Sequence, residues 1–101
     1  MYFQVNISAE DKKQADNILN TLLKKKLVTG GQFIKAPARF WWEGEIVDID
    51  YFTITTFTID KHKEEIISIV KKLSEEEVPT ITFTKFESNK ELLSWIDKTV
   101  G

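Results

Sequence analysis

The segment from Phe40 to Ile59 constrains the fold more than any other part of the chain. Three aromatic residues, Phe40 to Trp42, come directly before Glu43-Gly44, and a run rich in Ile, Thr, Tyr and Phe follows. Glycine adopts positive φ at no steric cost, and aromatic and β-branched residues favour strands. The segment therefore predicts a β-hairpin that turns at Glu43-Gly44 and carries two adjacent tryptophans.

Trp41 and Trp42 cannot both be buried in the same way, because adjacent strand residues point to opposite faces of a sheet. We expect one ring to enter the core of the chain and a neighbouring subunit to cover the other. Tryptophan suits such packing, since it buries ~150–250 Å² and is enriched at interface hot spots. A stacking platform that faces a ligand is the alternative role for the pair.

The strand predicted from Glu45 to Ile59 is longer than the ~3–10 residues usual for a strand. Its second half carries large side chains on both faces, with Phe52, Ile54 and Thr56 on one face and Tyr51, Thr53, Thr55 and Phe57 on the other. This pattern is typical of a strand that is covered on both sides.

The first part of the chain predicts a strand, a helix and a second strand. Polar and apolar residues alternate from Tyr2 to Ile7, and Ser8 to Asp11 then supplies an N-cap. The following helix has an apolar stripe from Ala15 to Leu23 and is expected to end before Gly30-Gly31. The second strand covers Gln32 to Trp42.

Proline at position 37 lies inside that second strand. Because proline lacks the backbone donor of the hydrogen-bond ladder, Pro37 indicates an edge strand, a bulge or a bend.

The rest of the chain again predicts a helix, a strand and a helix. Asp60 is expected to cap a second helix, whose apolar stripe runs from Ile66 to Leu73, and Thr80 to Phe86 forms a fourth strand. Ser88 to Glu91 has the pattern of a capping box and opens a last helix carrying Leu92 to Ile96. The order β-α-β-β-α-β with a trailing helix is that of ferredoxin-like α+β folds, in which two helices cover one face of an antiparallel sheet.

Length and charge exclude several classes of protein. A chain of 101 residues is expected to form one domain over residues 1–101. The net charge of −2 argues against a partner made of nucleic acid, which usually requires a basic patch. We find no signal-peptide pattern and no run of the ~20 apolar residues that a membrane span needs. We therefore expect a cytoplasmic protein without a membrane partner.

The residue types also limit the chemistry. The chain has no cysteine, which excludes disulfides, thiolate metal sites and a cysteine nucleophile. Its single histidine, His62, lies between Lys61 and Lys63, whereas copper and zinc sites usually require two or more His or Cys ligands. We expect an exposed surface role for His62. We identify no catalytic motif and predict that the protein is not an enzyme.

Two further features have both a structural and a functional interpretation. Gly30-Gly31 is typical of a helix end, although two glycines can also form an anion-binding nest. The acidic run Glu75 to Glu77 is typical of a solvated helix end, although converging carboxylates bind hard cations such as Ca²⁺ or Mg²⁺.

Three motifs together resemble a known family over nearly the whole chain. Phe40 to Ile46 resembles an aromatic-Trp-x-Gly hairpin, and Glu77-Val78-Pro79 before Thr80-Ile81 resembles a Glu-Val-Pro element that enters a fourth strand. Leu93 to Ile96 resembles a Leu-x-Trp-Leu signature in a last helix. In this order and at this spacing, the motifs resemble the CutA family of divalent-cation-tolerance proteins.

The resemblance implies a compact homotrimer of ferredoxin-like protomers in which the long hairpin crosses between subunits. It also implies a ligand cleft between subunits, with divalent copper as the ligand most often proposed. Transferred to this chain, the cleft residues are Trp41, Trp42, Glu43 and Glu77, and Glu77 is the expected metal ligand.

Departures from the family pattern predict a divergent member. Val28 to Gln32 stands where the family has Ala-Ala-Cys-Val-Asn, Ser74 to Glu76 stands where it has His-Pro-Tyr, and Phe57 replaces a basic residue. We therefore expect weak binding of metal ions or a small ligand and no required cofactor. The alternative is a PII-like signalling or regulatory trimer that binds a small-molecule effector, which depends on fold analogy alone.

Overall fold

Strands and helices alternate along the chain as the sequence predicts, and they form one four-stranded antiparallel sheet with the strand order β2-β3-β1-β4. The computed structural model describes all residues from Met1 to Gly101. Its elements are β1 (Tyr2–Ala9), α1 (Lys12–Lys24), β2 (Gly31–Trp42), β3 (Glu45–Ile59), the short 3-10 helix η1 (Asp60–His62), α2 (Lys63–Leu73), β4 (Ile81–Lys85) and α3 (Lys90–Val100). The α+β, ferredoxin-like arrangement is confirmed.

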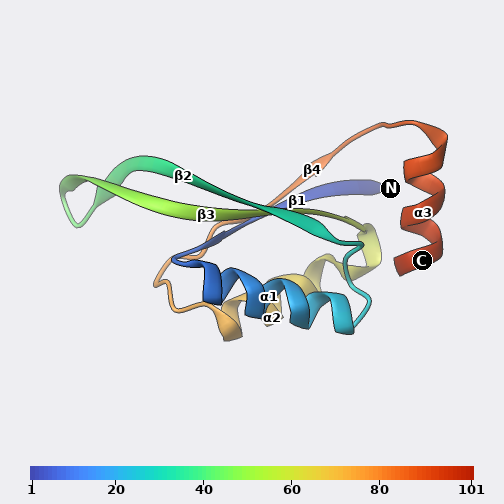
Figure 1. Ribbon diagram of the computed structural model, residues 1–101, viewed down its shortest axis with the longest axis horizontal. Helices are drawn as coiled ribbons and strands as arrows, with labels where there is room; N and C mark the ends of the chain where they lie inside the picture. Colours follow the sequence, from blue (N-terminus) through green and yellow to red (C-terminus); the bar gives the residue numbers. More distant parts are fainter.

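The hydrophobic core lies between one face of the sheet and the pair of helices α1 and α2, which run side by side beneath it (Figure 1). Burial alternates strictly along β1, because successive strand residues point to opposite faces. The helices turn the apolar stripes read from the sequence toward these strand residues. The fully buried side chains at the centre are Val5, Ile7, Ile18, Leu22, Ile54, Ile66 and Val70.

Helix α1 ends at Lys24, before the glycine pair as predicted, but a lysine rather than a glycine forms the turn that follows it. Lys26 takes the left-handed conformation that usually falls to glycine, with φ of 56°. Its amide donates to the carbonyl of Leu23, and the amide of Leu27 donates to that of Leu22, each at 3.0 Å. Burial of Leu27 against the core stabilises this helix end despite the lysine at the turn.

The segment between α1 and β2 is attached to β3 by buried threonines. Thr58 donates its hydroxyl proton to the carbonyl of Leu27 and Thr56 to that of Gly30, each at 2.6 Å. Gly31 then begins β2, where a Cβ atom would overlap the backbone oxygen of Thr55. The glycine pair therefore serves close packing of the chain against β3 rather than termination of the helix.

The hairpin of β2 and β3 turns at Glu43-Gly44, as predicted. Both residues have positive φ, 48° and 81°, which is the geometry of a type I′ turn. β2 is an edge strand, and Pro37 pairs with Asp50 in an uninterrupted register. The edge position predicted for Pro37 is thus confirmed.

The far half of this hairpin extends beyond the rest of the sheet (Figure 1). β1 pairs with β3 only from Phe52 to Ile59, whereas residues 45–51 pair with β2 alone. We call residues 36–51 the overhang. Trp41 is 71% exposed and Trp42 37%, so the expectation that one ring enters the core of the chain is wrong. The two helices end beneath the near half of the hairpin and leave both faces of the overhang uncovered.

Helix α3 lies at the opposite end of the molecule from the hairpin turn (Figure 1). Ile96 and Val100 are buried, and the hydroxyl of Tyr2 donates to the carboxylate of Asp97 at 2.8 Å. Nε2 of His62 lies 2.7 Å from the carbonyl oxygen of Val100, which can only accept a hydrogen bond. His62 is half-buried, so the expected exposed role is replaced by a structural one that joins η1 to α3.

Two predicted helix caps differ from the observed ones. The N-cap of α3 is Asn89, whose side chain makes no capping bond to the helix backbone. Its side-chain amide instead donates to the carboxylate of Glu91 at 3.1 Å. Helix α2 begins at Lys63, and Asp60 belongs to the preceding 3-10 turn.

Replacing Thr58 with valine tests the attachment of this loop. Thr58→Val keeps the shape of the side chain but leaves the buried carbonyl of Leu27 without its donor, so we expect the free energy of unfolding to fall by about 1–3 kcal/mol. Urea unfolding measures the change. Thr84→Val, at an exposed position on β4, is the matched control and should cost less than ~0.5 kcal/mol. Equal costs for the two variants would contradict the role of this hydrogen bond.

Candidate functional site

Within one chain, the predicted cleft residues do not lie together. Trp41 and Trp42 are at the end of β2 on opposite faces, Glu43 forms the turn, and Glu77 lies between α2 and β4. Trp42 pairs with Glu45, which is seven residues along β3 from Phe52, where the β1 pairing ends, or roughly 23 Å. A cleft that contains both groups would need a second subunit.

A polar cluster occupies the base of the overhang, at the junction of β1, β3 and the segment before β4. The hydroxyl of Ser8 donates to Glu76 and accepts from the backbone amide of Thr80, each at 2.8 Å. The amide of Ser8 donates to the carbonyl of Thr80 at 3.0 Å, and the amide of Glu76 donates to the hydroxyl of Ser74 at 3.1 Å. Ser8 therefore fixes the position of the Glu76 carboxylate relative to the sheet.

Tyr51 and Glu10 complete this cluster, which we call the junction site: Ser8, Glu10, Tyr51, Glu76 and Thr80. Burial raises the pKa of the Tyr51 phenol, and hydrogen bonding to Glu76 and the negative charges of Glu76 and Glu10 raise this pKa further. The phenol stays protonated at neutral pH and remains a hydrogen-bond donor. The junction site thus has a negative field that favours a cation or a ligand rich in donors.

Local sequence explains why Ser8 is available for this role. Asp11, rather than Ser8, caps α1, and its carboxylate accepts from the amide of Gln14 at 2.8 Å. The side chain of Gln14 in turn accepts from the amide of Glu10 at 3.2 Å, much as in a capping box. The side chains of Asp11 and Gln14 accept hydrogen bonds from the backbone amides at the start of α1. The hydroxyl of Ser8 is therefore free to bond to Glu76 and Thr80.

Glu77 and Glu76 differ in their surroundings. Glu77 is exposed, as is Glu75, whereas Glu76 is half-buried and bonded to Ser8. The sequence analysis selected Glu77 and considered Glu76 only as part of the acidic run Glu75 to Glu77, and it missed Ser8, Glu10 and Tyr51. The capping pattern of Asp11 with Gln14 was the available signal, because it frees Ser8 at the end of β1.

The junction site offers oxygen donors only. Carboxylate and hydroxyl oxygens suit hard divalent cations, whereas copper and zinc prefer imidazole and thiolate. One chain brings together no group of three or more His, Cys, Asp or Glu side chains, so it supplies only part of a coordination shell. His62 is held at the other end of the sheet by Val100 and does not contribute.

The sequence matches the family described as CutA1 divalent ion tolerance protein over residues 3–99. It is 32% identical over 101 residues to the divalent-cation tolerance protein CutA of Archaeoglobus fulgidus, and the match covers 99% of both chains. It is 28% identical over 87 residues to CutA of Pyrococcus horikoshii, with 85% of both chains covered.

Solved structures give the same result. A structure called the periplasmic divalent cation tolerance protein CutA from Archaeoglobus fulgidus matches all of both chains, with a TM-score of 0.95 and 31% identity. The Thermus thermophilus divalent cation tolerance protein Cut A1 also matches all of both chains, with a TM-score of 0.94 and 23% identity, and it supports the fold alone. None of the helices in the present structure has the length and apolar composition needed to cross a bilayer.

The titration of Tyr51 tests the geometry of the junction site. In a Tyr2→Phe background Tyr51 is the only tyrosine, and we expect its pKa to lie above the ordinary value of 10.0. Adding Glu76→Gln should lower this pKa, because one negative neighbour is lost. Absorbance of the ionised phenol against pH measures both values.

The raised pKa of Tyr51 determines how the stability of the folded chain changes with pH. The neutral phenol stabilises the folded chain below pH 10, and this contribution is lost as the pH rises through the pKa of the folded state. Tyr51→Phe should therefore weaken the decline of stability above pH 10. An unchanged pKa in Glu76→Gln would contradict the placement of Glu76 beside the phenol.

Proposed function

Because the chain belongs to the CutA1 divalent ion tolerance protein family, we propose that it acts in divalent-cation tolerance by binding rather than by catalysis. The observation that carries the proposal is the junction site, where Ser8 holds the carboxylate of Glu76 and the negative charges of Glu76 and Glu10 act on the protonated phenol of Tyr51 at the foot of an uncovered hairpin. A cation or a small polar ligand bound there would be completed by groups from a neighbouring subunit. No required cofactor and a cytoplasmic location remain predictions from the sequence.

The partner that completes the site is, in this proposal, another copy of the chain in a homotrimer. One face of the overhang carries a continuous apolar row, and its register places these side chains side by side on β2 and β3. Ile49 is 46% exposed, and the rings of Phe40 and Tyr51 lie 5.7 Å apart, with Ile34, 49% exposed, continuing the row beyond the overhang. A two-stranded ribbon is only marginally stable in water. Contact with other subunits would stabilise the two-stranded overhang.

The same row links assembly to ligand binding. Tyr51 belongs both to this apolar face and to the junction site, so a subunit that covers the overhang would also close one side of the cluster. Trp41, Trp42 and Glu43 would reach the cleft from the hairpin, and Glu77 from the loop before β4. This arrangement unites the residues that one chain keeps apart.

Metal binding is expected to be weak and to depend on carboxylates. Copper prefers imidazole and thiolate ligands, and the chain has neither in a cluster. The comparisons are with CutA proteins, which favours this role over a PII-like regulator, and no feature of the site favours the regulator.

The proposed assembly predicts a mass of three times 11.7 kDa for the native protein. Light scattering coupled to size-exclusion chromatography measures this mass. A monomer at micromolar concentration would contradict the proposal.

Replacing both Trp41 and Trp42 with alanine tests the role of the overhang in assembly. Truncating a large buried aromatic side chain to alanine costs ~3–5 kcal/mol of stability. If both rings are buried between subunits, we expect the double variant to lose several kcal/mol of stability and to dissociate. Thermal unfolding and native mass detect both effects. An unchanged melting temperature together with an unchanged mass would contradict the packing role.

Calorimetric titration with Cu²⁺ tests the metal proposal. We expect no site tighter than roughly micromolar, equivalent to about −8 kcal/mol, because the available donors are oxygens. Glu76→Gln and Glu77→Gln should each weaken the remaining binding. His62→Ala is the control and should change it little, since His62 is bonded to Val100 away from the junction site.

The opposite pattern would overturn this account of the metal site. Nanomolar affinity for copper, or binding lost in His62→Ala and kept in Glu76→Gln and Glu77→Gln, would indicate a histidine-centred site.

A further inference from the structure

The junction site gathers hydrogen-bond acceptors around a negative charge. The hydroxyl of Ser8 donates to Glu76 at 2.8 Å and holds this half-buried carboxylate in place. The phenol of Tyr51 also donates its proton to Glu76, so the lone pairs of the phenol oxygen remain free to accept. The negative charge of Glu10 acts on the same phenol. Two carboxylates and a phenol oxygen thus offer acceptors to a ligand that carries several N–H donors.

The basic side chains of the sheet all lie on its other face. Lys35, Arg39 and Lys85 are the basic residues of the four strands, and the register places them on the face that packs on α1 and α2. Tyr51 is an odd number of residues from the fully buried Ile54 and therefore lies on the opposite face. The sheet itself thus supplies no positive charge to the carboxylates of the junction site.

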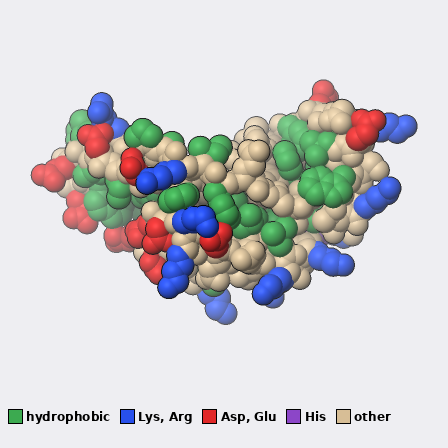
Figure 2. Space-filling model, in the orientation of Figure 1, with side chains coloured by type: hydrophobic (Ala, Val, Ile, Leu, Met, Phe, Trp, Pro, Cys, Tyr) green, Lys and Arg blue, Asp and Glu red, His purple; other side chains and the backbone are tan.

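The ion pairs of the chain also leave these carboxylates free. The pairs join Met1 to Asp60, Lys12 to Asp16 and Arg39 to Asp48. In Figure 2, Asp and Glu side chains gather around apolar side chains at the hairpin end of the molecule, whereas Lys is more frequent at the α3 end. The half of the molecule that carries the junction site therefore attracts a positively charged ligand with an apolar part.

Aromatic rings beside the acceptors favour an organic cation over a metal ion. The ring of Tyr51 lies next to that of Phe40, with the ring centroids 5.7 Å apart. An ammonium group binds favourably to an aromatic face, and its methylene groups pack on apolar surface. A hard metal ion instead needs several converging oxygen ligands, and this chain brings together no group of three or more His, Cys, Asp or Glu side chains.

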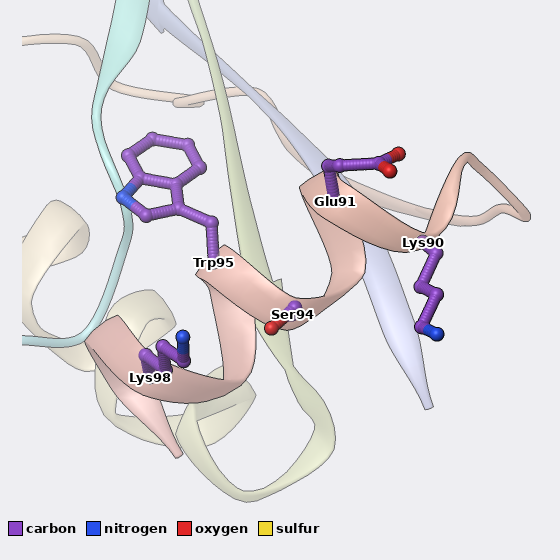
Figure 3. Close-up of a pocket in the computed structure, with 5 residues that line it drawn as sticks. All are labelled: Lys90, Glu91, Ser94, Trp95 and Lys98. Atoms are coloured by element: carbon purple, nitrogen blue, oxygen red, sulfur yellow. The ribbon is translucent and has the colours of Figure 1, made fainter.

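A hollow of about 440 Å³ on the outer face of α3 is a weaker candidate for a ligand site. Its lining residues all come from this one helix and are Lys90, Glu91, Ser94, Trp95 and Lys98. Figure 3 shows the Trp95 ring turned toward the segment that precedes β2, while Lys90 and Glu91 point in different directions. Ligand sites depend on polar groups that converge, as they do at the junction site.

We propose that the junction site binds the primary ammonium group of a small aliphatic amine. The three N–H groups of the ammonium donate to the carboxylates of Glu76 and Glu10 and to the phenol oxygen of Tyr51. The adjoining methylene groups lie against the rings of Tyr51 and Phe40. This inference rests on the proposed function, because it names the ligand class of the same site, but each of these contacts comes from one chain.

An NMR titration of the wild-type protein at neutral pH tests the proposal, with n-butylammonium chloride as the probe and the amide signals of Ser8 and Glu76 as the readout. Butyltrimethylammonium keeps the positive charge but has no N–H donor, and 1-butanol keeps the chain without the charge. We expect n-butylammonium to bind about tenfold more tightly than either compound, because charge-assisted hydrogen bonds are the strong ones. Equal affinities for n-butylammonium and butyltrimethylammonium would overturn the proposal.

Three variants locate the site. Glu76→Gln should weaken n-butylammonium binding about tenfold, because a charged acceptor is lost. Tyr51→Phe keeps the ring but loses the oxygen, and it should weaken binding about threefold. Glu75→Gln removes an exposed carboxylate from the same acidic run and is the matched control, with an expected change of less than about twofold. Equal losses in Glu75→Gln and Glu76→Gln would indicate charge attraction without a site and would overturn the proposal.

A parallel titration with Cu²⁺ separates this inference from the proposed function. If Cu²⁺ binding falls in Glu76→Gln while the affinity for n-butylammonium is unchanged, the amine proposal is overturned and cation binding at the junction site stands. If neither Cu²⁺ nor n-butylammonium depends on Glu76, both proposals are overturned.

Discussion

The length of β3 is the constraint on which the rest of this structure depends. Its 15 residues pair with β2 throughout, but β1 accompanies only the half from Phe52 to Ile59. That half lies over α1 and α2 and forms the centre of the core. The other half extends past the core with Val47, Ile49 and Tyr51 on one face, so the fold of one chain leaves an exposed apolar surface that the proposed assembly would cover.

The junction site lies where the covered half of β3 gives way to the overhang. Ser8 at the end of β1 holds Glu76 there, and Tyr51 is the first residue of β3 beyond the β1 pairing. Cover of the overhang and closure of the cluster are therefore one event in the proposed assembly. Such coupling would allow a chain without cysteine or a free histidine to form the proposed polar cleft between subunits.

Much of the fold could be predicted from the sequence, because it depends on local chemistry. The Glu43-Gly44 turn and the bounds of β3 follow from turn propensity and alternation. The left-handed turn at Lys26 could not be predicted, because it depends on the tertiary burial of Leu27. The junction site was missed for a similar reason, since its members are brought together only by strand order and by the choice of Asp11 over Ser8 as the helix cap.

Amide hydrogen exchange along the overhang tests most directly whether other subunits cover it. Exchange reports local opening, and an uncovered two-stranded ribbon opens readily. The account predicts that the amides of residues 38–40 and 46–50 are protected nearly as strongly as those of Val5 and Ile7 in β1, and that dilution below the dissociation point removes this protection. Rapid exchange of these amides in concentrated protein would contradict the account.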